Sequence, residues 1–142
     1  MCPAARVLMS GTLADVERLR RSSPYVLAAL LALAGMTHLV RPQWFDGLVP
    51  PLLPGNARTW TVVSGVVELL LAAAVAVPRT RRGGGLAAAA LFVAVFPGNV
   101  WMAVEPGGVP RWAALARLPL QVPLVLWGLQ VAGKLPSTGR RA

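Results

Sequence analysis

The residues of this sequence that could carry out chemistry are a few polar side chains set within long apolar segments. Glu68 lies in the middle of the apolar run 60–77, and Arg117 and Gln121 lie in another run nearer the carboxyl terminus. An ionisable side chain at bilayer depth costs at least a few kcal/mol unless a partner compensates it. A carboxylate, a guanidinium and an amide at such a depth could bind a polar ligand or transfer a proton.

The spacing of these residues places them on shared helix faces. Arg117 and Gln121 are four residues apart, as are Ser64 and Glu68, so that each pair lies on one side of a helix. Two interpretations follow. Glu68 and Arg117 could form an ion pair that fixes the pairing of the second and fourth segments, or they could form part of a ligand or proton site.

All four apolar segments contribute polar groups to the same half of the bilayer. The candidate site residues are His38, Ser64, Glu68, Asn99, Arg117 and Gln121. His38 by itself is more typical of a hydrogen-bonding residue at a helix end than of a metal or haem ligand, and we expect no metal site.

The composition predicts the elements that position these residues. Of the 142 residues, 56% are hydrophobic and 13% are charged, whereas soluble domains average about 45–50% and about 25%. This composition predicts an all-α fold, an antiparallel bundle of four transmembrane helices. The expected spans are residues 24–40, 60–77, 86–104 and 112–133.

The chain then divides into three parts. Residues 1–23 form an amino-terminal lead-in, residues 24–133 form the membrane domain, and residues 134–142 form a basic tail. Ser22 and Ser23 before Pro24 predict that the first helix begins there, and the basic, glycine-rich segment 79–85 predicts a tight turn.

The distribution of basic residues predicts the orientation. The lead-in carries four of them, the segment 79–82 three and the tail three, whereas the opposite side carries only Arg41, Arg58 and Arg111. By the positive-inside rule both termini are expected in the cytoplasm. Tryptophans agree, because four of them fall near the opposite, outer face, namely Trp44, Trp60, Trp101 and Trp112.

Several classes of function are excluded. Cys2 is the single cysteine, which excludes a disulfide, a CxxC redox pair and an iron–sulfur site within one chain. The single histidine excludes a bis-histidine haem. The net charge of +9 does not indicate nucleic-acid binding, because the basic residues are spread over the ends of the apolar segments.

Four ordered motifs resemble those of the DoxX-like membrane proteins. The first, GMTHL at residues 35–39 followed by VP at 49–50 and LP at 53–54, is similar to the family pattern GxxHF…VP…LP. SGVVEL at 64–69, FPGNVWMA at 96–103 and RLPLQ at 117–121 resemble SGxxEL, FPANxxMA and RLPLQ. Leu39 and Gly98 depart from the usual phenylalanine and alanine without removing a polar group.

The resemblance implies a four-helix bundle in a bacterial-type inner membrane. It singles out His38, Glu68, Asn99, Arg117 and Gln121 by motif match. Members of that family include a subunit associated with quinone-linked oxidation, other redox-associated membrane proteins and receptor-assembly chaperones.

We therefore expect an accessory subunit of a quinone-linked or other redox membrane complex, with no covalent cofactor and a polar site that could bind a quinone. The sequence holds no redox centre of its own, so whether the protein is an enzyme stays open. The alternative is a non-catalytic assembly factor or scaffold in which the Glu68–Arg117 pair is structural. A small-solute carrier is a weaker alternative, because no inverted repeat is visible. The expected partners are the lipid bilayer, a redox or assembly protein and a second copy of the chain.

Overall fold

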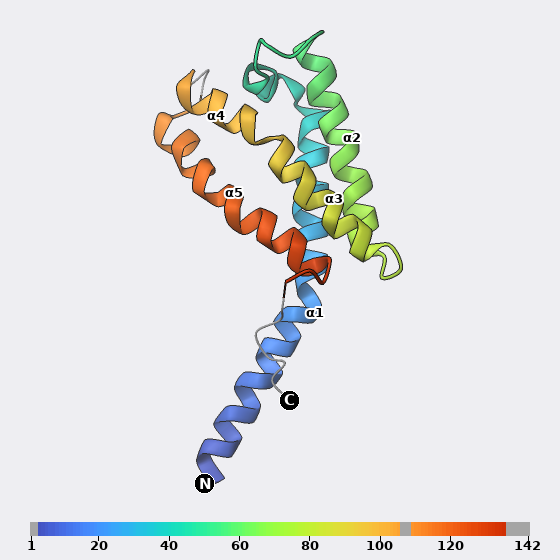
Figure 1. Cartoon of the computed structure of the whole chain (residues 1–142), viewed down its shortest axis with the longest axis vertical. Helices are drawn as coiled ribbons and strands as arrows, with labels where there is room; N and C mark the ends of the chain where they lie inside the picture. Colours follow the sequence, from blue (N-terminus) through green and yellow to red (C-terminus); the bar gives the residue numbers. More distant parts are fainter. Residues whose placement is uncertain (1–2, 106–108, 136–142) are drawn as a thin grey trace.

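The computed structural model describes residues 3–105 and 109–135, which are all-helical with no strand (Figure 1). Five α-helices follow one another: α1 (Pro3–Val40), α2 (Ala57–Ala76), α3 (Arg81–Ala94), α4 (Phe96–Val104) and α5 (Arg111–Val131). Two short 3-10 helices, η1 (Pro42–Trp44) and η2 (Asp46–Leu48), lie between α1 and α2.

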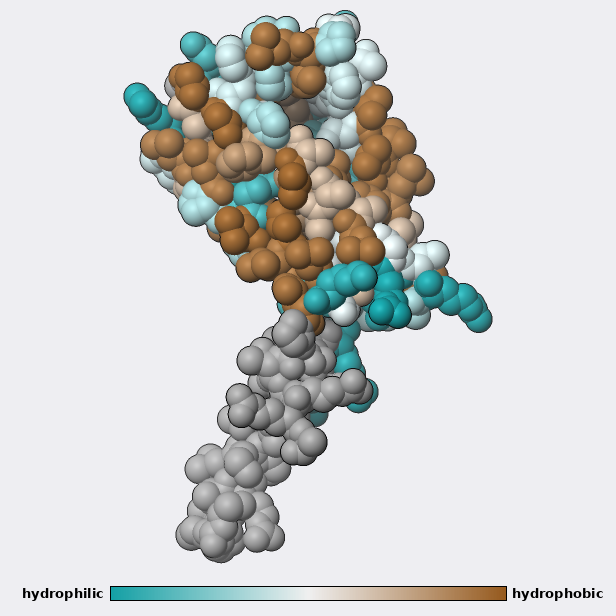
Figure 2. All heavy atoms as spheres, viewed as in Figure 1, coloured by the Kyte–Doolittle hydropathy of each residue, from teal (hydrophilic) through white to brown (hydrophobic). Residues whose placement is uncertain are grey.

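Four helical segments are long and apolar enough to cross a membrane. They are Arg21–Val40 within α1, Ala57–Ala76, Arg81–Val104 and Arg111–Val131. The all-α class and the four expected spans are confirmed in this sense. Large apolar side chains such as Leu33, Leu70 and Leu120 are exposed, and brown apolar atoms cover much of the bundle surface in Figure 2.

The expected start of the first helix at Pro24 is wrong, because α1 begins at Pro3 and continues through Pro24. A proline inside a helix removes one backbone donor, and its fixed φ suits a helix that is already formed. Ser23, expected to cap the helix, instead accepts a hydrogen bond of 2.8 Å from Trp127 Nε1 on α5. The first half of α1 extends away from the other helices (Figure 1).

The third span consists of two helices rather than one. Val95 separates α3 from α4, two residues before Pro97. Proline has no N–H to bond the carbonyl one turn earlier, so the helical ladder is interrupted here. Figure 1 shows α4 continuing the course of α3 beyond this break.

The glycine run 83–85 is helical and belongs to α3, so the expected turn over 79–85 is too long and the expected span start at residue 86 is too late. Small residues are required here for close packing. A Cβ on Gly84 would lie 2.8 Å from the Ala74 carbonyl carbon, and one on Gly85 would lie 2.8 Å from the Gly128 oxygen. The glycines thus let α3 approach α2 and α5.

Helix α1 packs on α2, and α3 packs on both α2 and α5. At the end near the α2–α3 turn these helices enclose a core of buried apolar residues, namely Leu27, Leu31, Ala72, Val75, Ala88 and Phe92. At the other end α4 packs on α5, where Met102, Ala103 and Ala114 form a second cluster with Leu48 of η2. The polar residues lie between or beside these two clusters.

Candidate functional site

His38 and Glu68 form a close pair between α1 and α2. His38 Nδ1 lies 2.8 Å from Glu68 Oε2, and only 14% and 11% of the two side chains are exposed. The contact is short but not aligned as a regular hydrogen bond, and neither atom has another partner in the described part of the chain. The two side chains thus form a nearly buried polar contact between α1 and α2 whose facing atoms have no hydrogen bond of regular geometry.

Two glycines bring the pair together. A Cβ on Gly65 would lie 2.8 Å from the His38 Cβ, and one on Gly35 would lie 2.7 Å from the Gly65 oxygen. Helices α1 and α2 therefore approach more closely here than any larger residue would allow. Phe45, which precedes η2, packs edge-on against the His38 ring with 3.9 Å between ring centroids.

Asn99 and Gln121 form a second polar pair, between α4 and α5. Asn99 Nδ2 donates a hydrogen bond of 2.9 Å to Gln121 Oε1. Gln121 is 7% exposed, and its Nε2 has no acceptor among the described residues. The two amides connect α4 to α5.

The expected ion pair between Glu68 and Arg117 is wrong. Glu68 pairs with His38, and Arg117 instead directs its Nη1 at Met102 Sδ, 3.8 Å away. The order of helix packing explains the difference, because α2 packs on α1 and α3 whereas α5 packs on α3 and α4. Two polar residues in the same half of the bilayer need not lie on neighbouring helices.

The six predicted site residues thus divide between two places. His38 and Glu68 meet between α1 and α2, with Ser64 half-buried one turn from Glu68. Asn99, Gln121 and Arg117 lie along the α4–α5 contact. Within the described ranges no group of three His, Cys, Asp or Glu side chains could hold a metal ion.

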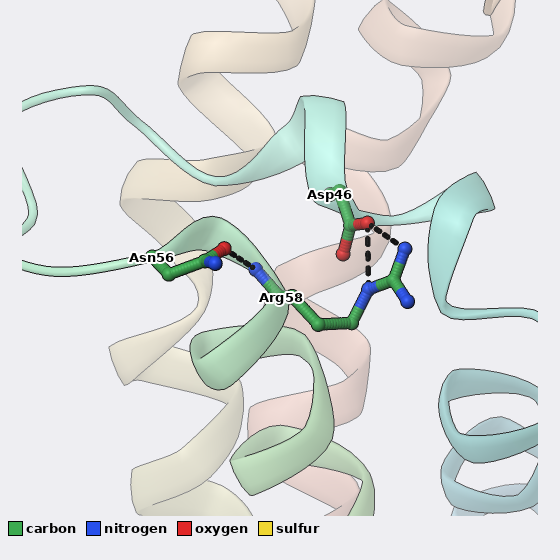
Figure 3. A network of polar contacts seen from close by, with 3 residues as sticks. All are labelled: Asp46, Asn56 and Arg58. Atoms are coloured by element: carbon green, nitrogen blue, oxygen red, sulfur yellow. Dashed lines mark hydrogen bonds and ion pairs between the residues drawn. The ribbon is translucent and has the colours of Figure 1, made fainter.

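An ion pair that the sequence reasoning missed holds the α1–α2 connection (Figure 3). Arg58 Nη2 and Nε lie 2.7 and 2.9 Å from Asp46 Oδ2, while Asn56 caps α2 by accepting from the Arg58 backbone N–H at 2.8 Å. The hydrogen bonds from Arg58 lower the pKa of Asp46 from its usual value of 3.8, against a smaller opposing effect of burial. Asparagine just before a helical segment is a preferred cap, which is the signal that could have found Asn56.

Thr61, also missed, is the most deeply buried of the polar residues named here, at 3% exposed. It lies on α2 one turn before Gly65 and two turns before Glu68, on the face that packs against α1 and η2. Its hydroxyl contributes to the lowered pKa of Asp46 but makes no hydrogen bond of regular geometry. Buried polar atoms without a hydrogen-bond partner among the described residues therefore occur from Asp46 in the α1–α2 connection, through Thr61, to the His38–Glu68 pair.

These features define a class of protein: a small all-α chain with four helices able to cross a membrane and with paired polar side chains between them. Residues 27–132 match the model of a family described as a domain of unknown function, DUF8561. The match spans well over half of the chain, so the protein belongs to this family, and it includes both polar pairs. No curated protein and no solved structure matches the chain.

Proposed function

We propose that the protein is an accessory subunit of a membrane redox complex and binds a quinone head group at the His38–Glu68 pair. The observation that carries this proposal is the 2.8 Å contact between two nearly buried side chains whose facing atoms have no hydrogen bond of regular geometry among the described residues. Natural proteins rarely leave buried polar atoms unsatisfied without a bound group or a functional reason.

The chemistry of the pair suits a quinone. A quinone carbonyl oxygen accepts hydrogen bonds, and its reduction to a quinol takes up two electrons and two protons. The pair could hold the proton for one carbonyl oxygen. The electrons must come from a redox partner, and the second proton from that partner or from solvent, because Cys2 and His38 are the only cysteine and histidine in the chain.

We further propose an antiparallel arrangement in a bacterial-type inner membrane, with both termini in the cytoplasm. The bias of basic residues toward the two ends and the segment 79–82 supports this orientation. The resemblance to DoxX-like proteins supports both the location and the redox role, because its motifs contain His38 and Glu68.

Quinone binding is tested on the full-length protein in lipid nanodiscs, with decylubiquinone as the probe. We expect saturable binding and about tenfold lower affinity in Glu68→Gln, the effect of losing one hydrogen bond to a charged group. Arg82→Gln, which removes an exposed charge elsewhere, is the control and should bind as the native protein does. Absence of saturable binding, or equal binding by Glu68→Gln, would contradict the proposal.

A scaffold or assembly factor is the second candidate, favoured by the same close packing at Gly35 and Gly65. In that case the His38–Glu68 pair serves only to fix α1 against α2. Glu68→Gln would then lower the melting temperature in detergent, while the protein that stays folded would capture its partner as before. A stable variant that fails to bind quinone would instead favour the ligand site.

A further inference from the structure

Arg117 is a cation within a candidate membrane span and has no ion-pair partner among the described residues. Its side chain is exposed, and its one described side-chain contact is the 3.8 Å approach of Nη1 to Met102 Sδ. A thioether is a weak acceptor, and a guanidinium carries five N–H donors. Most of the bonding capacity of Arg117 is therefore unused.

No acidic side chain that the structure describes pairs with Arg117. The chain has five, of which Asp46 pairs with Arg58 and Glu68 with His38. Glu105 makes no ion pair with any described basic side chain. The described acidic side chains therefore supply no counter-charge to Arg117.

The guanidinium lies near the end of the bundle that carries η1 and η2. Side chains on a helix lean toward its amino terminus, which for α5 is this end. Met102 is two residues from the end of α4, about 3 Å along the helix axis. Trp112, 75% exposed, and Arg111 flank the same end, as residues at a membrane interface do. If the bundle spans a membrane as proposed, the guanidinium can reach the level of the lipid head groups at this end.

We infer that Arg117 binds the phosphate of a phospholipid in the leaflet facing the η1–η2 end, with the acyl chains lying along α4 and α5. Phosphate is the anion present at that level of every phospholipid bilayer, and a guanidinium binds it through two parallel hydrogen bonds. Exposed apolar side chains continue below Arg117 on the outer faces, including Leu120 and Val122 of α5 and Val100 of α4. Figure 2 shows hydrophilic atoms interrupting the brown surface partway along the bundle.

The test is native mass spectrometry of the full chain released from dodecyl maltoside with limiting phosphatidylglycerol. We expect one retained lipid per native protein, about tenfold weaker retention by Arg117→Gln, and an intermediate loss in Arg117→Lys, which keeps the charge but not the fork. Arg82→Gln, an equal loss of charge at the other end of the bundle, should retain lipid normally.

Three further readouts decide the assignment. Phosphatidylcholine should be retained as well, and diacylglycerol, which has no phosphate, should not. Arg117→Gln should keep its melting temperature in lipid-free detergent, because the side chain is exposed and its one described polar contact is with the weak acceptor Met102 Sδ. Equal retention by Arg117→Gln, retention of diacylglycerol, or loss of a protein dimer with unchanged lipid binding would overturn the inference.

Discussion

The imidazole of His38 and the carboxylate of Glu68 meet between two helices that approach closely because Gly35 and Gly65 have no side chains. The contact thus depends on two features: the polar groups of the pair, and the small glycines that let the two helices come close. The Asp46–Arg58 pair acts differently, because it is more exposed and holds the connection in front of α2. These two sets of residues make separate predictions.

Gly65→Ala should destabilise the protein by about 1–3 kcal/mol, the usual cost of overpacking. The new Cβ would lie 2.8 Å from the His38 Cβ and 3.0 Å from the Gly35 oxygen, so α1 and α2 must separate. Thermal unfolding in detergent measures the effect. Gly83→Ala is the control, because nothing lies within 4 Å of its added Cβ, and it should be neutral or slightly stabilising. Equal melting temperatures for Gly65→Ala and the native protein would refute the close-packing argument.

The Asp46–Arg58 pair should make stability depend on pH in the acid range. Arg58 lowers the pKa of Asp46 below 3.8 in the folded state. A group with a lowered folded pKa stabilises the protein above its unfolded pKa, and that contribution is lost as the pH falls through the folded pKa. The native protein should therefore melt above Asp46→Asn at neutral pH, and the gap should shrink below about pH 4. A gap that stays constant with pH would show that the charge of Asp46 is not its cause.

At the scale of helices, polar side chains fix the ends of the spans. Arg81 Nε and Nη2 donate hydrogen bonds of 3.0 Å to the Val75 and Ala76 carbonyls, which end α2. The Arg81 guanidinium carbon also lies 5.0 Å from the Tyr25 ring centroid on α1. One side chain thus connects three helices, since Arg81 begins α3. The Trp127–Ser23 hydrogen bond connects α5 to α1 at the same end.

Arg81→Ala should lower the free energy of unfolding by about 1–3 kcal/mol, because two helix-end carbonyls lose charged donors. Arg82→Ala is the matched control. It removes the same charge from the neighbouring position, where the side chain is exposed. Thermal or denaturant unfolding of both variants in one detergent compares them. A larger effect from Arg82 than from Arg81 would contradict the capping role.

At the scale of the whole molecule, the His38–Glu68 and Asn99–Gln121 pairs lie between helices, and the larger apolar core lies at the end near the α2–α3 turn. The pair α1–α2 and the pair α4–α5 each carry a polar contact, and α3 packs on one helix of each pair. Leu48 of η2 packs against the Met102–Ala114 cluster, so the connection after α1 reaches across to α4 and α5. The proposed quinone site and the proposed phosphate site therefore belong to different helix pairs.

The proposed orientation predicts which positions a membrane-impermeant thiol reagent reaches in intact cells. In a Cys2→Ser background, Leu52→Cys should react from outside, because Leu52 is 92% exposed in the connection before α2. Arg82→Cys, exposed at the opposite end of α2 and α3, should react only after the membrane is opened. The reverse labelling pattern would show the opposite orientation. Labelling of both cysteine variants in intact cells would contradict the four-span arrangement.

The sequence alone determined the all-α class, the four apolar segments and the identity of the polar residues. These depend on length and hydropathy along the chain, which are local properties. Even so, local signals failed at Pro24, through which α1 continues, and at the glycine run 83–85, where Gly84 and Gly85 belong to α3 and pack closely against α2 and α5.

Only the tertiary structure decided the partners. Glu68 and Arg117 have complementary charges and similar depths, yet Glu68 pairs with His38, 30 residues earlier in the sequence. Which helices touch depends on where small residues permit close approach, as Gly35 does against Gly65 and Gly85 against Gly128. The depth of a residue can be counted along its own helix. Which residues of two helices lie close together depends on the rotation and order of the helices, and contacts between residues distant in sequence determine these.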